Sequence, residues 1–463
     1  MTAPPTTSGV PPTAAHASND IVAGPLDRAL LRLAGPAILA KSLYAVLSLA
    51  DVFWVGRLGA APTAAVNTGF FTSWILQAAT SLTAVGILAH VARHLGAGDR
   101  KRAEHAATQG VLIGVLLGTV LGGVAWLLAP RLFDLLGTAP EVRQPGVTYL
   151  RILFLAAPLT FTWMNAEALM RAAGNTRTPL VIIGAMVLVN GALDPFLIFG
   201  IGPFPRLEVV GAGLATWISQ AIAVAAFALL PARGEPSFPF ARRALSRVDF
   251  GLAARFLRMG TPTMSVGVLF SGVYLFLSAV AARLGTVELA VLGLGNRSET
   301  FTYLVSSGFG AAAAAVVGQN LGARQEARAA RAAWRSTAWM GLYGTIVGAV
   351  LVVWPREVLA LFTSDAAVLD TGATYTRIIG LCQGLMAVEI VLAHAFAGAG
   401  DTLPPMLISV PLNLVRVPLV FVILERFDGG ILAIGWLLSI TAALRGVLAA
   451  AWFARGKWKD RKL

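Results

Sequence analysis

Long apolar stretches recur along almost the whole chain, and they limit its fold more than any other feature. A helix needs about 20 predominantly apolar residues to cross the hydrocarbon core of a bilayer. Charged residues, proline and glycine divide the chain into twelve such stretches: 36–58, 64–91, 107–129, 148–171, 178–201, 210–231, 254–283, 288–318, 335–358, 374–397, 405–425 and 431–453. Only 13% of the 463 residues are charged and the mean hydropathy is +0.74, whereas soluble proteins have about 25% charged residues. The sequence therefore predicts an all-α polytopic membrane protein with twelve transmembrane helices.

The basic residues indicate how these helices are oriented. The net charge is +13, but Arg and Lys gather in the gaps between apolar stretches, which argues against a nucleic-acid partner. The loops after the second, sixth and eighth stretches and the C-terminal tail hold most of them: Arg93, Arg100, Lys101, Arg102, Arg233, Arg242, Arg243, Arg247, Arg324, Arg328, Arg331, Arg455, Lys457, Lys459, Arg461 and Lys462. Because cytoplasmic loops are enriched in Lys and Arg, we expect both termini in the cytoplasm and the protein in the plasma (inner) membrane.

The chain repeats itself at an offset of 226 residues. Four separated anchors align at this distance: Pro36 with Pro262, Leu58-Gly59 with Leu284-Gly285, Leu95-Gly96-Ala97 with Leu321-Gly322-Ala323, and Ala173-Gly174 with Ala399-Gly400. Each half holds six stretches, an even number, so both halves enter the membrane in the same orientation. This predicts two six-helix bundles related by a pseudo-twofold axis along the membrane normal, as in several transporters. The alternative is an old duplication without mechanical meaning.

The repeat also predicts the boundaries of the parts. The first residues are rich in Pro, Thr and Ala and lack the basic start and apolar core of a signal peptide. We expect five segments: a disordered cytoplasmic tail at 1–24, an N-terminal bundle at 25–232, a cytoplasmic linker at 233–252, a C-terminal bundle at 253–454 and a basic tail at 455–463.

Several motifs resemble one transporter family in their order and spacing. The first stretch contains "LADVFWVGRLG"; "LGAGD" and "GQNLGA" follow the second and eighth; "MRAAGNTRTP" and "AFAGAGDTLPP" follow the fourth and tenth. Together they resemble the multidrug and toxic compound extrusion (MATE) family over about residues 25–455, in particular its prokaryotic branch with an aspartate in the first helix. The resemblance implies an exporter of organic molecules.

A cluster of polar residues in the first half has no counterpart in the second. Asp51 aligns with Leu277, Asp194 with Val420, and Asn190 with Arg416. Ionised residues inside a membrane are costly and are functional by default. Asn190 and Asp194 are four residues apart and share one helix face, and Thr216 in the sixth stretch lies at a similar depth. We therefore expect Asp51, Asn190, Asp194 and Thr216 to meet in the outward part of the first bundle.

Such a cluster suits an ion. Two buried carboxyl groups favour uptake of a proton, and the same oxygens at Asp51, Asn190 and Asp194 are hard ligands for Na⁺. The family resemblance also implies ion coupling by the first-helix aspartate with polar residues of the fifth helix, and it adds Asn165 and Thr216 as further candidates. A knot of polar residues that merely ties helices together is the structural alternative.

The second half offers a separate set of candidates for substrate binding or a second acidic site. Glu299 follows Arg297 and is expected to be a locally paired helix-end residue. Glu389 lies deeper, with His394 little more than one turn away, and Arg416 is expected to pair with Glu389 or to face a cavity. From the first half, Trp163 and Met164 are candidates to line an adaptable apolar cavity.

The sequence thus favours a secondary antiporter that exports amphipathic, often cationic, molecules in exchange for H⁺, or for Na⁺. It contains no GxxxxGK[ST] motif for ATP, and we expect no cofactor besides the ion and a monomer in the bilayer. The alternative transporter is a lipid-linked oligosaccharide flippase, which needs a strongly cationic cavity. An intramembrane enzyme is disfavoured, because His90 and His94 lack the glutamate of an HExxH zinc helix, and the single Cys382 excludes a cysteine metal site.

Overall fold

The computed structural model describes residues 21–463 except 136, 236–237, 428 and 462. Within these residues the chain is helical and contains no strand. The α-helices are α2 (Leu26–Gly56), α3 (Ala60–Gly96), α4 (Arg100–Leu135), α5 (Pro140–Leu155), α6 (Ala157–Ala172), α7 (Arg177–Phe199), α8 (Val209–Ala232), α9 (Phe250–Leu284), α10 (Thr286–Gly322), α11 (Glu326–Val353), α12 (Pro355–Ala360), α13 (Ala366–Gly380), α14 (Gln383–Ala399), α15 (Leu403–Leu414), α16 (Arg416–Phe427) and α17 (Gly430–Ala454). Two short 3₁₀ helices are η1 (Arg242–Leu245) and η2 (Lys457–Asp460).

The described helices supply the expected membrane spans. Ten segments are long and apolar enough to cross a bilayer, and two bent pairs raise the number to twelve if each pair is one span. The pairs are α5/α6, bent by 46°, and α13/α14, bent by 51°. At the first bend Pro158 has no N–H to give to the carbonyl of Phe154, so the helix ladder is interrupted there.

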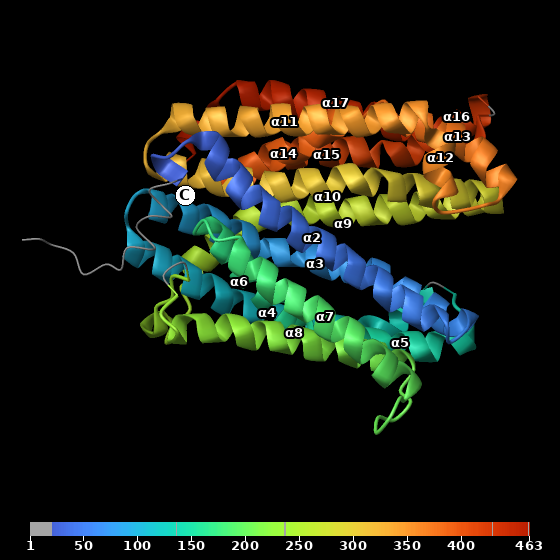
Figure 1. Ribbon diagram of the computed structural model, residues 1–463, viewed down its shortest axis with the longest axis horizontal. Coiled ribbons are helices and arrows are strands. Elements are labelled where there is room, and N and C mark those ends of the chain that lie inside the picture. The colour runs from blue at the N-terminus through green and yellow to red at the C-terminus, as the bar shows by residue number, and fades with distance from the viewer. Residues whose placement is uncertain (1–20, 136, 236–237, 428, 462) are drawn as a thin grey trace, which may run out of the picture.

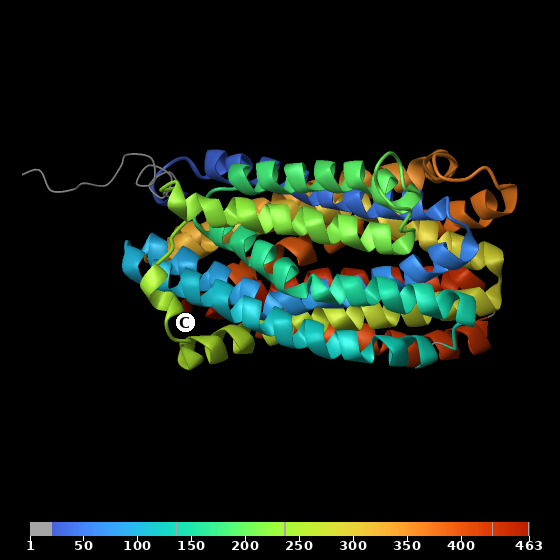
Figure 2. The same ribbon diagram turned by 90° about the horizontal axis from the view of Figure 1, so that it is seen from below.

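The two halves of the chain fold alike and lie side by side. Helices α3 and α10 differ by 226 in residue number at both ends, which is the offset found in the sequence. Helices α2–α8 form one bundle and α9–α17 the other, with helix axes that run roughly along the long axis of the molecule (Figures 1 and 2). The predicted fold class, two six-helix bundles in an all-α membrane protein, is confirmed.

The first helix of each bundle crosses into the other bundle. Leu26, Leu30 and Leu33 of α2 belong to a buried cluster with residues of α10, α11 and α14, whereas Leu47 packs among residues of α3, α6 and α7. Phe256 of α9 is likewise buried in the N-terminal bundle. Each crossing helix therefore connects the inner end of one bundle to the outer part of the other.

The bundles meet closely near the end that holds the C-terminus. A Cβ atom on Gly96 would lie 1.9 Å from the carbonyl oxygen of Gln319, and one on Gly322 would lie 2.0 Å from that of Arg93. These two contacts exchange places under the 226-residue offset. Gln319 Nε2 also donates to the carbonyl of Ala172 at 2.7 Å. The glycines of the repeated Leu-Gly-Ala motif therefore allow α3 and α10 to approach backbone to backbone.

The connecting segments are held at the same end. The linker packs on α4, where Gln109 Nε2 donates to the carbonyl of Arg247 at 2.7 Å, and Asp249 caps α9 by accepting from Leu252 N at 2.9 Å. Of the predicted N-terminal tail, residues 1–20 lie outside the described residues. Ile21 is fully buried, so the ordered chain begins before the boundary predicted at residue 24.

A larger side chain at residue 96 should separate the bundles. In Gly96→Val the new Cβ cannot stay 1.9 Å from Gln319 O, so the labelled ends should move apart by more than an ångström. Double electron–electron resonance between spin labels at Arg177→Cys and Leu403→Cys, two exposed positions on opposite bundles, should show longer distances; the native Cys382 is buried. Gly123→Val, where a Cβ meets nothing within 4 Å, is the matched control, and equal distances in both variants would contradict the contact.

Candidate ion-coupling site

Three helices of the N-terminal bundle bring the predicted cluster together. Asp51 lies on α2, Asn190 and Asp194 lie one turn apart on α7, and Thr216 lies on α8. Asn190 and Asp194 are fully buried and Thr216 is 9% exposed. The i,i+4 spacing directs both α7 side chains to the side where α2 and α8 pack. The structure therefore assembles these four residues as the sequence predicts.

Asn190 connects the three helices. In the amide orientation that suits both neighbours, its Nδ2 donates to Asp51 Oδ1 at 3.1 Å and its Oδ1 accepts from the Thr216 backbone N–H at 3.2 Å. In the opposite orientation Nδ2 lies 3.4 Å from Thr216 Oγ1. The amide can thus satisfy a carboxylate on one side and a backbone donor on the other.

Asp194 has no comparable donor. Neither carboxylate oxygen has a hydrogen-bond donor among the residues that the structure describes, although both are buried. Its polar neighbour is the carboxyl group of Asp51, which lies within hydrogen-bonding reach. Two carboxyl groups can hydrogen-bond only when one of them carries a proton. The pair therefore calls for a proton, or for a small cation between its oxygens.

A small cavity adjoins this pair. Its volume is about 70 Å³, room for about two waters at roughly 30 Å³ each. Polar side chains from several helices line it: Tyr44, Asp51, Ser73, Gln77, Tyr149, Thr160, Thr216 and Gln220. Two internal bonds order this lining, from Gln77 Nε2 to Tyr44 Oη at 3.0 Å and from Thr160 Oγ1 to Gln220 Oε1 at 2.8 Å. The space suits water and a small ion but is too small for an organic substrate.

The sequence analysis did not single out Tyr44, Gln77, Tyr149 or Gln220. A signal was available for three of them. Tyr44 lies seven residues before Asp51 and hence on nearly the same helix face, and the two glutamines are uncharged polar residues inside apolar stretches. Tyr149 has no such signal, because it reaches the site only through the packing of α5 against α8.

Three other candidates of the first half lie outside the cluster. Asn165 Oδ1 accepts from Thr83 Oγ1 at 3.0 Å and ties α6 to α3 instead. Trp163 is 3% exposed and packs against Tyr44 with ring centroids 5.7 Å apart. Met164 accepts a contact from Thr80 Oγ1 at 3.5 Å. These side chains fill the bundle interior behind the cavity.

In the C-terminal bundle the expected partner of Arg416 was wrong. Arg416 is 2% exposed and donates through Nε to Thr441 Oγ1 at 2.8 Å and through Nη1 to Asn413 Oδ1 at 2.9 Å. Glu389 instead forms an ion pair with Arg445 at 3.6 Å and accepts from Ser409 Oγ at 3.1 Å. Helix α17 carries both Thr441 and Arg445 on one face, so it supplies a partner to each group.

The two remaining candidates of this bundle also have different surroundings from those expected. Glu299 is not a locally paired helix-end residue, because it lies inside α10 and accepts from Tyr274 Oη of α9 at 3.3 Å. His394 donates through Nδ1 to the carbonyl of Ile390 at 2.8 Å and packs against Gly310. The described residues of this bundle therefore form a network of paired charges rather than an acidic site.

Comparison with known proteins identifies related chains over almost the full length. The family model MatE matches residues 36–196 and 262–422, which are themselves 226 residues apart. The chain is 26% identical over 443 residues to "Probable multidrug resistance protein NorM" of Thermotoga maritima, covering 94% of each chain. It is 26% identical over 434 residues to "FAD transporter" of Shewanella oneidensis, covering 92% of this chain and 94% of that one.

Solved structures share the fold. The chain resembles the "Outward-facing conformation of a multidrug resistance MATE family transporter of the MOP superfamily" with a TM-score of 0.85 and 21% identity, covering 96% of this chain and 99% of the other. A MOP superfamily transporter from Pyrococcus furiosus, described by the reverse polarity of its binding pocket, gives a TM-score of 0.87 at 20% identity over 96% of this chain and 99% of that one.

Removing one carboxyl group should stabilise the protein in base. An asparagine at residue 194 would donate to Asp51 and end the need for a shared proton. We expect Asp194→Asn to raise the thermal unfolding midpoint in detergent at pH 8, and to change it little at pH 5, where protons are abundant. Glu357→Gln, which removes an exposed carboxylate, should leave the midpoint unchanged at both pH values. A lower midpoint for Asp194→Asn at pH 8 would contradict the geometry.

The pairing of Glu389 with Arg445 can be tested by a double-mutant cycle. Glu389→Gln leaves a buried guanidinium without its carboxylate, which costs roughly 3–5 kcal/mol. The variant with both Glu389→Gln and Arg445→Gln should recover part of that loss, and thermal unfolding of the four proteins measures the coupling. Strictly additive effects would show that the ion pair does not contribute to stability.

Proposed function

The chain belongs to the MatE family of membrane transporters, and on this premise we propose that it exports amphipathic, often cationic, organic molecules in exchange for H⁺. The names of several relatives as multidrug resistance proteins support the export of such molecules. The proposed coupling site is Asp51, Asn190 and Asp194, with Thr216 at its edge. No cofactor is needed for this activity.

The observation that carries the proposal is the buried carboxyl pair. Asp194 has no donor among the described residues, and Asp51 is the group that faces it. A single proton lets the pair form a hydrogen bond, and loss of that proton brings two negative charges together in a poorly hydrated place. Proton binding and release thus change the interaction between α2 and α7. Na⁺ is the second candidate ion, because the same oxygens can ligate it.

Helix α2 offers a physical route from the ion to the rest of the molecule. Its outer half carries Asp51 in the N-terminal bundle, and its inner half is buried against the C-terminal bundle. A shift of α2 at the carboxyl pair therefore strains the contacts that hold the bundles together at the inner end. The basic loops support a cytoplasmic position for that end and for both termini, so the structure corresponds to the state that is closed to the cytoplasm.

The flippase alternative lacks a comparable observation. Its pyrophosphate-linked substrate calls for free cationic groups in the cavity, whereas Arg416 and Arg445 are both engaged within the C-terminal bundle. An intramembrane enzyme is excluded by membership of a transporter family. Glu389, Glu299, Arg416 and His394 are best assigned to the framework of the C-terminal bundle, with the coupling chemistry confined to the first.

Reconstituted transport tests the proposal directly. In proteoliposomes with an imposed pH or Na⁺ gradient, the wild type should move a fluorescent organic cation against its gradient, driven by the pH gradient. Asp51→Asn and Asp194→Asn should reduce the gradient-driven rate at least about tenfold, because the coupling proton loses its site. Glu357→Gln is the control, and unfolding midpoints show that the variants fold.

The outcomes separate the alternatives. Drive by the Na⁺ gradient alone would replace H⁺ with Na⁺, and full gradient coupling in both aspartate variants would refute the site. FAD is a useful second substrate, since one relative is named as its transporter; transport of FAD but not of the cation would overturn the proposed substrate class.

A further inference from the structure

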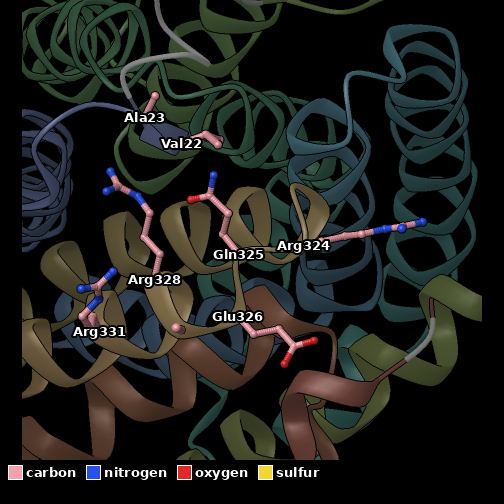
Figure 3. Close-up of a pocket in the computed structure, with 8 residues that line it drawn as sticks. Val22, Ala23, Arg324, Gln325, Glu326, Arg328 and Arg331 are labelled. Atoms are coloured by element: carbon pink, nitrogen blue, oxygen red, sulfur yellow. The ribbon is translucent and has the colours of Figure 1, made fainter.

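A basic pocket lies where the start of α2 meets the loop between α10 and α11. Its volume is about 770 Å³, and Val22, Ala23, Arg324, Gln325, Glu326, Ala327, Arg328 and Arg331 line it. In Figure 3 Arg328, Arg331 and Gln325 extend toward the side of Val22 and Ala23, whereas the carboxylate of Glu326 points the opposite way. Neither Arg324 nor Arg331 forms an ion pair with a residue that the structure describes.

The internal repeat provides a control for this surface. At the offset of 226 residues, Arg328 corresponds to Arg102 and Arg331 to His105. In the N-terminal bundle both groups face carboxylates: Arg102 is 3.2 Å from Asp99, and His105 is 3.1 Å from Asp249 of the linker. The Leu252 N–H and His105 hold the pKa of Asp249 below its usual range, so this carboxylate is charged.

The C-terminal bundle lacks both carboxylates. Gln325 stands where the first half has Asp99, and the position corresponding to Asp249 lies beyond the end of the sequence. Gly98, which has a φ of +74°, corresponds to Arg324, which holds a φ of +58°. A left-handed backbone is strained for a residue with a side chain, so this half has a third arginine where glycine would fit freely. The same surface is thus charge-balanced in one half and left cationic in the other.

The pocket continues into an apolar face of α11. Trp334, Leu342 and Ile346 follow Arg331 at helical spacing and are 38%, 63% and 56% exposed. They extend along about 22 Å of helix beyond Arg331, at 1.5 Å per residue, which is more than the hydrocarbon thickness of one leaflet. Helix α11 is one of the candidate spans, so this face meets lipid and the arginines lie at its polar boundary.

We infer that this pocket binds the phosphate of an anionic phospholipid of the inner leaflet, with an acyl chain along Trp334, Leu342 and Ile346. A phosphate supplies the negative charge that Asp99 and Asp249 supply in the other half, and guanidinium groups bind it through paired hydrogen bonds. The preceding residues 1–20 are a poor substitute ligand, because Asp20 is their single acid. A lipid satisfies both the cationic pocket and the exposed apolar face.

The bound lipid would act on a contact between the two bundles. Arg328 donates to the carbonyl of Ile21 at 3.2 Å and to that of Gly24, and Asn320 Nδ2 lies 3.4 Å from the Ile21 carbonyl. These bonds hold the segment that enters α2 against the C-terminal bundle. A phosphate beside Arg328 orders that guanidinium, so the lipid stabilises the arrangement closed at this end.

Lipid binding to the full-length protein tests the inference. Native mass spectrometry and thermal unfolding in detergent should show saturable binding of phosphatidylglycerol and a higher unfolding midpoint, with much weaker effects of phosphatidylcholine of the same chain length. Arg331→Gln should weaken phosphatidylglycerol binding about fivefold, the typical contribution of one basic residue near an anionic lipid surface. Arg324→Gln, which removes no described bond, should have a similar effect.

Two further variants sharpen the test. Gln325→Asp restores the carboxylate of the other half without removing an arginine and should also lower the affinity. Arg258→Gln removes an exposed positive charge at the start of α9 and should bind lipid like the wild type. Equal binding of phosphatidylglycerol by wild type, Arg331→Gln and Gln325→Asp would overturn the site. Equally tight binding of inorganic phosphate alone, or of phosphatidylcholine, would overturn its assignment to an anionic lipid.

Discussion

The exchange of helix halves between the two bundles is the constraint on which the rest of the molecule depends. Leu30 of α2 is buried in the C-terminal bundle and Phe256 of α9 in the N-terminal one, so neither bundle has a complete core by itself. Van der Waals packing of this kind holds transmembrane helices together where lipid removes the hydrophobic driving force. The bundles can therefore reorient only by changing how α2 and α9 pack, which places the carboxyl pair on α2 and α7 beside a moving part.

Small residues make that packing close. Gly96 and Gly322 bring the backbones of α3 and α10 together near the pseudo-twofold axis, and Gly308 lets α10 approach Ile38 of α2. The remaining inner contacts are hydrogen bonds to backbone carbonyls, such as that from Gln319 to Ala172. Such contacts are specific yet individually weak, which suits an interface that has to open and close during transport.

Much of this arrangement was predictable from the sequence because it follows from periodic features. Hydropathy identified the twelve spans, and the 226-residue offset identified the bundles. The helix ends were less accessible: α2 begins ten residues before Pro36, because a proline can lie inside a long helix packed on its neighbours. The break between α13 and α14 has no proline to mark it, whereas Pro418 explains the one before Arg416, since it cannot donate to the carbonyl of Leu414.

The site divides in the same way. Asp51, Asn190 and Asp194 were accessible because a charge inside an apolar stretch is visible in one sequence, and the repeat showed that they belong to one half only. The partners of Arg416 and Glu389 were not, since they depend on the rotation of α17, which sequence spacing does not fix.

The structure adds a reason for the asymmetry. Asn190 meets Thr216 across α7 and α8, and its counterpart Arg416 meets Thr441 across α16 and α17. A fixed guanidinium thus occupies the place that corresponds to the exchangeable site. Under the proposed mechanism the C-terminal bundle keeps its positive charge throughout the cycle, and only the N-terminal bundle gains and loses one.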